Sequence, residues 1–191
     1  MSDDRTLTQA VHDLGSALWF GGAVMGIAGV NKSGSDLRDG LDKVRVAGSA
    51  WKRFAPVEWA GIGAVLLTGS QLTRSSSQRI ALQQGYGTVG ALKVGFVLAG
   101  AAATAYASYA GARIARAAEE AAGRGETVDV HDATRPSSAT PPEVARWQER
   151  QRVVQFAVPV LAGGNIVCNA ALVQSYRAGA TVKGVLGRFL P

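Results

Sequence analysis

Four stretches of mostly apolar residues alternate with polar segments along the chain. They cover about residues 7–30, 54–73, 89–112 and 153–176. The first has no charge for eighteen residues from Leu14 to Asn31, and the fourth has none for twenty-four from Val153 to Tyr176. A hydrocarbon layer about 30 Å thick is crossed by roughly twenty such residues in a helix. The pattern therefore predicts an all-α fold, a four-helix transmembrane bundle with helical extensions, in a single domain of residues 1–191.

Two of the predicted spans contain a charged residue. Glu58 lies one turn inside the second span, which is the weakest because only the next fifteen residues are uncharged, and Lys93 lies one turn inside the third. Intramembrane charges by default suggest an ion or proton path. The simpler interpretation is that Lys93 extends to the head groups and that Glu58 pairs with Lys52 or Arg152. Because the two spans run antiparallel, Glu58 and Lys93 are expected at opposite ends.

The first span carries a stripe of small residues on one helical face. Its members recur at steps of three or four: Gly15, Trp19, Gly22, Gly26 and Gly29. Glycines on a membrane helix allow another helix to approach closely. We therefore expect this stripe to be a helix-packing face and a docking interface for a membrane partner. In the fourth span, Asn165 and Asn169 lie one turn apart and are expected to cross-link helices.

The longer polar segments differ in character. Residues 31–53 carry six bases and three acids, with apolar residues at helical intervals. They predict an amphipathic segment on the membrane surface or folded back on the bundle, with a plain polar connection as the alternative. The third helix is expected to continue beyond the membrane to Gly123. Residues 124–142 contain three prolines and show no periodicity, so we expect a mobile linker, followed by a helix from about Pro142.

The basic residues are distributed unevenly between the connections. Of twenty Lys and Arg, thirteen lie in or beside the first and third connections, and seven lie elsewhere. The positive-inside rule then predicts a multi-pass plasma-membrane protein with both longer loops in the cytoplasm and both termini outside. In this position the bases contact anionic lipid head groups, and no nucleic acid is expected as a partner.

The candidate chemistry is sparse. His12 is the only histidine in a span and Cys168 is the only cysteine, so these two are weak candidates for a metal site. His131 lies in the linker, and Met25 lies too deep in the membrane to join them. Transmembrane haem uses two axial ligands, and copper(I) prefers several sulfur ligands. We therefore expect no cofactor and favour a hydrogen-bonded packing role for His12. The sequence has no catalytic motif such as G-x-S-x-G or H-E-x-x-H, so we expect no enzyme and no soluble small-molecule substrate.

One sequence run resembles a known family. His12-x6-Trp19-x-Gly21-Gly22, followed by Lys93 near the start of a later span, resembles four-span bacterial proteins related to the membrane domain of the copper-resistance protein CopD. The resemblance implies a four-helix membrane fold and, for members that handle copper, a copper or haem site. This chain lacks the further intramembrane His and Met residues of such members. Its composition, rich in Ala, Gly and Arg, is similar to that of actinobacterial membrane proteins.

Two functions follow as expectations. The first is a non-catalytic accessory or structural subunit of a larger envelope complex, such as a lipid transporter, with that complex and membrane lipids as partners. The alternative is a CopD-like copper- or haem-binding protein, or a small ion-coupled membrane transporter.

Overall fold

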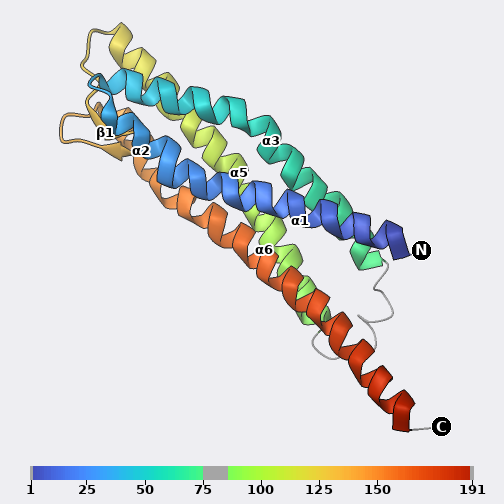
Figure 1. Ribbon diagram of the computed structural model, residues 1–191. Coiled ribbons are helices and arrows are strands. Elements are labelled where there is room, and N and C mark those ends of the chain that lie inside the picture. Colours follow the sequence, from blue (N-terminus) through green and yellow to red (C-terminus); the bar gives the residue numbers. More distant parts are fainter. Residues whose placement is uncertain (1, 75–85, 190–191) are drawn as a thin grey trace.

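Four long helices make up most of the molecule (Figure 1). The computed structural model describes residues 2–74 and 86–189, and the side chains of residues 4–74 and 86–174. The long helices are α1 (Ser2–Met25), α3 (Gly40–Arg74), α5 (Tyr86–Gly123) and α6 (Pro142–Phe189). The described residues include two short strands, β1 (Val130–Asp132) and β2 (Arg135–Pro136), which pair antiparallel. The prediction of an all-α fold is therefore confirmed.

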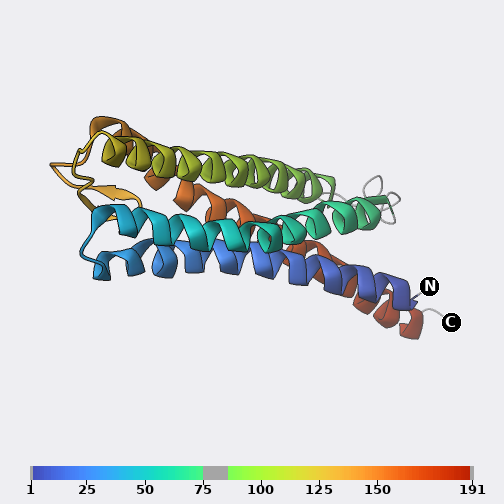
Figure 2. The same ribbon diagram turned by 90° about the horizontal axis from the view of Figure 1, so that it is seen from above.

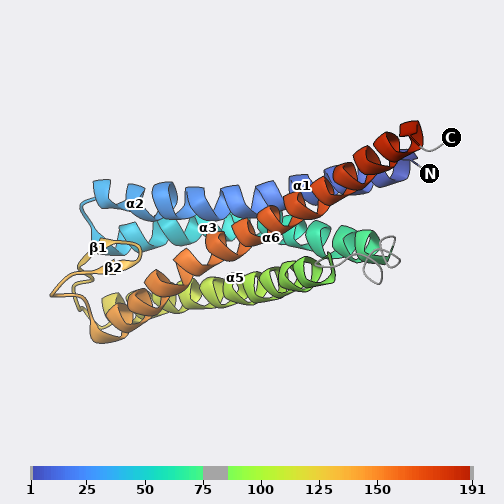
Figure 3. The same ribbon diagram turned by 90° about the horizontal axis from the view of Figure 1, so that it is seen from below.

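The helices run up and down as a bundle. After α1 the chain continues through a π-helical turn (Gly26–Val30), α2 (Asn31–Ser33) and a 3-10 turn (Gly34–Asp36) before it reverses into α3. Helix α1 packs along α3, and α5 packs along α6, which crosses the bundle to reach α1 (Figures 2 and 3). The N-terminus, the start of α5 and the C-terminal part of α6 lie at one end, which we call the terminal end. The α2–α3 connection and the strands lie at the other, the hairpin end.

Three of the helices could cross a membrane by length and composition. They are α1 with its continuation (Asp4–Asp36), α5 (Tyr86–Gly123) and α6 (Pro142–Gln174). Helix α3 is less apolar, because it carries Glu58 and a polar run of Gly, Ser, Thr and Gln near its C-terminus. The count of four spans thus depends on α3.

Residues 31–53 do not form a separate amphipathic segment. Most of them belong to α3, which is one helix of 35 residues. Val44 and Ala47 are buried on the same face that continues into the predicted span. Because the apolar face keeps one helical register across the expected membrane boundary, the helix does not break there. The connection is confined to the short turn before Gly40.

Residues 124–142, predicted as a mobile linker, instead form a packed hairpin. Val128, Val130 and Ala133 are buried against the helices. The Asp129 carbonyl accepts hydrogen bonds from the hydroxyls of Ser137 and Thr140, so the polar groups of the segment satisfy one another. Helix α6 begins at Pro142, as predicted.

The hairpin closes a core that lies largely beyond the predicted spans. This extension core joins residues from α3, α5, the hairpin and α6, namely Val44, Ala110, Ile114, Ala117, Ala118, Ala121, Val128, Val130, Val144 and Trp147. On its surface Arg45 donates two hydrogen bonds to Glu119, at 2.7 and 2.8 Å, which raise the pKa of Arg45. The polar ends of α3, α5 and α6 are thus folded parts of the bundle.

Candidate functional site

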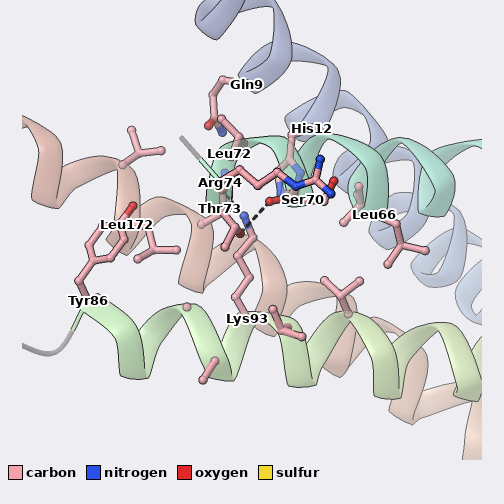
Figure 4. A pocket seen from close by; sticks show the side chains of 18 of the residues that line it. Gln9, His12, Leu66, Ser70, Leu72, Thr73, Arg74, Tyr86, Lys93 and Leu172 are labelled. Atoms are coloured by element: carbon pink, nitrogen blue, oxygen red, sulfur yellow. Dashed lines mark hydrogen bonds between the residues drawn. The ribbon is translucent and has the colours of Figure 1, made fainter. Parts of the chain in front are cut away.

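Buried polar side chains gather around two cavities inside the bundle. One, of about 560 Å³, lies toward the terminal end and is lined by His12 and Lys93; we call it the His12 cavity (Figure 4). The other, of about 760 Å³, lies toward the hairpin end and is lined by Glu58; we call it the Glu58 cavity. Together they form the candidate site.

His12 is fully buried and only half satisfied. Its Nδ1 lies 3.0 Å from the hydroxyl of Thr68, which in turn lies 2.5 Å from the carbonyl of Ala64. Because the hydroxyl proton is donated to that carbonyl, the hydroxyl accepts from Nδ1, and the neutral ring carries its proton there. Nε2 then presents a lone pair, and no described residue forms a hydrogen bond with it. The hydrogen-bonded role expected for His12 is therefore seen at Nδ1, whereas Nε2 has no partner among the described residues.

Lys93 is held inside the bundle. The residue is only 9 % exposed, and its ammonium donates a hydrogen bond of 2.6 Å to Asn169 on α6. Asn169 in turn donates to Asp13 on α1, at 2.8 Å, and Gln9 donates to the same carboxylate. A relay of side chains therefore connects Lys93 to α1, and the interpretation that Lys93 extends to the head groups does not match this geometry.

Asn165 links the same two helices one turn away. Its amide donates a hydrogen bond of 3.0 Å to Ser16 on α1, while its own oxygen has no partner among the described residues. Asn165 and Asn169 thus both join α6 to α1.

Glu58 is buried inside the bundle. It is 4 % exposed, and among the described residues none forms a hydrogen bond or an ion pair with its carboxylate. Lys52, one of its predicted partners, lines the same cavity without contacting it, and Arg152 does not line that cavity. As predicted from the antiparallel hairpin, Glu58 and Lys93 belong to opposite ends, and each lines its own cavity.

Amide side chains line the Glu58 cavity on the side of the carboxylate that faces the hairpin end. Trp51 donates to Asn31 at 2.8 Å, and Asn31 donates to Gln155 at 2.9 Å. The carbonyl oxygen of Gln151 is buried and has no partner within the described part of the chain. The cavity therefore contains two unsatisfied acceptors, Glu58 and Gln151.

A layer centred on Trp19 separates the two cavities. The indole is fully buried, donates a hydrogen bond of 3.0 Å to Thr104, and packs with Ala23, Ile62, Val158 and Ala162. Gly100 makes room for it, since a Cβ there would lie 2.6 Å from the ring. Along α5 the His12 cavity extends to Leu98 and the Glu58 cavity begins at Thr104. At a rise of about 1.5 Å per residue, the separating layer is about 9 Å thick.

The glycine stripe of α1 packs largely against another helix of the same chain. A Cβ on Gly15 would lie 2.7 Å from the carbonyl oxygen of Gly61 on α3. Cβ atoms on Gly22 and Gly26 would overlap the rings of Phe54 and Trp51, and Gly29 faces Met25 of its own helix. Three of the four glycines are therefore covered by α3, and Trp19 is turned into the interior, so the stripe does not provide an open docking face.

The weak metal candidates are not assembled into a site. Cys168 is buried with a free thiol and is absent from the lining of both cavities, and His131 is exposed on β1. In the part of the chain that the structure describes, no group of three or more His, Cys, Asp and Glu side chains could hold a metal ion.

Several residues of the site were not predicted from the sequence. They are the partners of the predicted ones: Asp13, Ser16, Thr68, Thr104, Asn31, Gln151 and Gln155. Asp13 directly follows His12 and directly precedes the uncharged stretch that begins at Leu14. This position in the sequence could have indicated a role for it in the site. The two threonines gave none, because their role depends on which helices become neighbours.

Comparisons with known proteins do not identify a relative. No family model, no curated protein and no solved structure matches this chain. The function must therefore be argued from the geometry of the two cavities.

Proposed function

We propose that this protein is a multi-pass protein of the plasma membrane in which all four long helices cross the bilayer. Large apolar side chains are exposed on each of them, for example Leu14 on α1, Leu67 on α3, Leu98 on α5 and Val160 on α6. In the apolar windows of α1, α5 and α6 only 28%, 17% and 22% of residues are buried, so most of these windows face outward. Hydrocarbon is the solvent that stabilises such a surface.

We take α3 as the fourth crossing because Glu58, the one charged residue between positions 54 and 73, points inward. Val57, Trp59, Leu66 and Leu67 are exposed on its outer face, whereas Glu58 is buried. A carboxylate that faces the bundle interior avoids the cost of contact with lipid. The bases of the extension favour the cytoplasm for the hairpin end, with both termini outside.

The function that this geometry supports best is proton transfer through the bundle, a form of small ion-coupled transport. The observation that carries it is the pair of cavities, one toward each end of the bundle, which are separated by the Trp19 layer of about 9 Å. Each cavity holds a buried ionisable group, Glu58 on one side and His12 on the other. Intramembrane ionisable groups of this kind typically mark proton relays.

The chemistry of the relay follows from the side chains at each level. Glu58 takes up a proton from the hairpin end, and Nε2 of His12 has the free lone pair that can receive it. In the closed state the indole blocks the passage and its N–H is held by Thr104. When the Trp19 side chain turns away, water entering between the cavities connects the two groups, and the proton leaves by the His12 cavity. A desolvated metal ion is disfavoured on this route, because Lys93 lies beside His12.

The test is proton flux into liposomes that contain the purified protein, followed with an entrapped pH-sensitive dye. We expect flux above that of empty liposomes, a severalfold increase for Trp19→Ala, and a loss to background for Glu58→Gln. Glu149→Gln removes an exposed acid on α6 and serves as the matched control, with unchanged flux. Background flux for both the wild type and Trp19→Ala would overturn the proposal.

The accessory role stays a prediction, based on the glycine stripe of α1 and on the basic helices of the cytoplasmic side. The glycine stripe does not support it, because the stripe packs largely against α3. The copper or haem alternative is limited to one free nitrogen, on His12. Neither prediction gains an observation from the structure.

A further inference from the structure

The Glu58 cavity has an unbalanced set of polar groups. A buried carboxylate without a partner is costly, so it is protonated or it has a cationic counterpart. Gln151, 7 % exposed, adds a second acceptor oxygen without a partner in the described chain. Both groups, the Glu58 carboxylate and the Gln151 carbonyl oxygen, can accept a hydrogen bond or attract a positive charge. The missing component is therefore a cation or a hydrogen-bond donor, and not an anion.

Among the residues that the structure describes, no neighbouring charge neutralises Glu58. The charged residues that line the cavity are Glu58, Lys52 and Arg45, all on α3, while α1, α5 and α6 contribute only apolar and neutral polar side chains. Arg45 is bound by Glu119 through two hydrogen bonds, and Lys52 is an exposed residue six positions from Glu58 toward the hairpin end. Glu58 is thus the one buried charge in this lining.

The size and walls of the cavity favour an organic cation over a metal ion. Its volume of about 760 Å³ is in the range of sites for drug-sized molecules. Around Glu58 the walls are largely apolar, formed by residues such as Ala23, Ile27, Ala107 and Val158. Trp51 adds an aromatic ring, which attracts cations at its face. A metal ion would leave these walls without contacts, whereas an apolar body attached to a positive centre would fill them.

We infer that the Glu58 cavity binds lipophilic organic cations, with the positive centre at the Glu58 carboxylate and the apolar body against the walls formed by α1, α5 and α6. Gln151 lies nearer the hairpin end and accepts a hydrogen bond from cations that carry an N–H group. The binding goes beyond proton transfer and does not need it. If the proton relay operates as well, the proton and the cation compete for the same carboxylate.

Titration calorimetry on the purified full-length protein in a neutral detergent tests the inference, with tetraphenylphosphonium as the probe. We expect one saturable site, at least tenfold weaker binding for Glu58→Gln, and unchanged binding for Glu149→Gln. Glu58→Asp keeps the charge and should retain binding, and thermal melting of each variant shows that it is folded. Binding should weaken at acidic pH, because a protonated Glu58 loses its attraction for the cation.

A second probe separates the two acceptors. Phenylbutylammonium carries N–H donors, whereas tetraphenylphosphonium has none. Gln151→Leu should weaken binding of the ammonium severalfold and leave the phosphonium unaffected, while Lys52→Gln should tighten both by removing a like charge. Absence of binding to the wild type, or equal binding by a folded Glu58→Gln variant, would overturn the inference. Since no flux is measured, either result is independent of the liposome experiment.

Discussion

His12 and Trp19 lie about two turns apart on the inner face of α1, and each is fully buried. Each also forms one hydrogen bond to a threonine on a neighbouring helix, Thr68 for the imidazole and Thr104 for the indole. The difference is that the indole has no further polar atom, whereas the imidazole keeps one nitrogen open. Trp19 can therefore act only as a barrier between the two cavities, whereas His12 can accept a proton at Nε2.

The barrier formed by Trp19 can be tested by removing the Thr104 hydroxyl, which accepts the hydrogen bond from the indole. Thr104→Val keeps the shape of the side chain but leaves the indole N–H unpaired in the interior, which costs about 1–3 kcal/mol. We expect a lower melting temperature in detergent and a faster proton leak in liposomes. Thr88→Val, at an exposed position of α5 that lines neither cavity, is the matched control and should change neither. An unchanged melting temperature for Thr104→Val would show that this bond does not hold the indole.

The closest approach of α1 and α3 gives a second residue-scale prediction. Gly15→Ala brings a methyl group to 2.7 Å from the backbone oxygen of Gly61, so the helices must separate. Overpacking of this kind costs typically about 1–3 kcal/mol. Gly21→Ala on the same helix has no neighbour within 4 Å and should be neutral or slightly stabilising. Equal melting temperatures of the two variants would contradict the packing.

The candidate site could be predicted only in part at this scale. Glu58, Lys93, Asn165 and Asn169 were found because polar groups in apolar runs are conspicuous. Their partners come from other helices, and Ser16 or Thr104 is unremarkable until the bundle brings it to Asn165 or Trp19. The glycine stripe was located correctly, but its neighbour turned out to be α3 of the same chain.

Among the elements, the apolar runs predicted the long helices, and the polar segments were misjudged. Charges do not end a helix when its apolar face continues, as it does through Val44 and Ala47 into the rest of α3. The hairpin is too short for periodicity and depends on the polar contacts of Asp129 with Ser137 and Thr140. Local patterns could not reveal these contacts, because they need the end of α3 and the start of α6 as a platform.

Docking of the hairpin can be tested through Gly40 at the start of α3. A Cβ at this position would overlap the backbone carbonyl of Val128, so Gly40→Ala displaces the hairpin. We expect faster cleavage by trypsin at Arg124, an exposed residue where α5 leads into the hairpin segment. Gly48→Ala, further along α3 with no neighbour within 4 Å, should leave the cleavage rate unchanged. Resistance of Gly40→Ala equal to that of the wild type would show that the hairpin does not rest on α3.

The whole molecule combines an apolar outer surface with a polar interior. Exposed Leu, Val and aromatic side chains cover the middle of the bundle, and the charged ends of α3, α5 and α6 form the extension core with the hairpin. The His12 cavity lies inside the part with the apolar surface, and the Glu58 cavity continues from it to the extension core, where Val44 and Ile114 line it. This arrangement is the reverse of a water-soluble helical bundle, and every functional proposal above depends on it.

The most direct test of this arrangement is the accessibility of single cysteines in the membrane of intact cells. In a Cys168→Ser background, Asp4→Cys marks the terminal end and Ser138→Cys marks the hairpin; both positions are exposed. The account predicts that a membrane-impermeant maleimide labels Asp4→Cys in intact cells and Ser138→Cys only after permeabilisation. Labelling of both cysteines from the same side, or recovery of the protein in the soluble fraction without detergent, would contradict it.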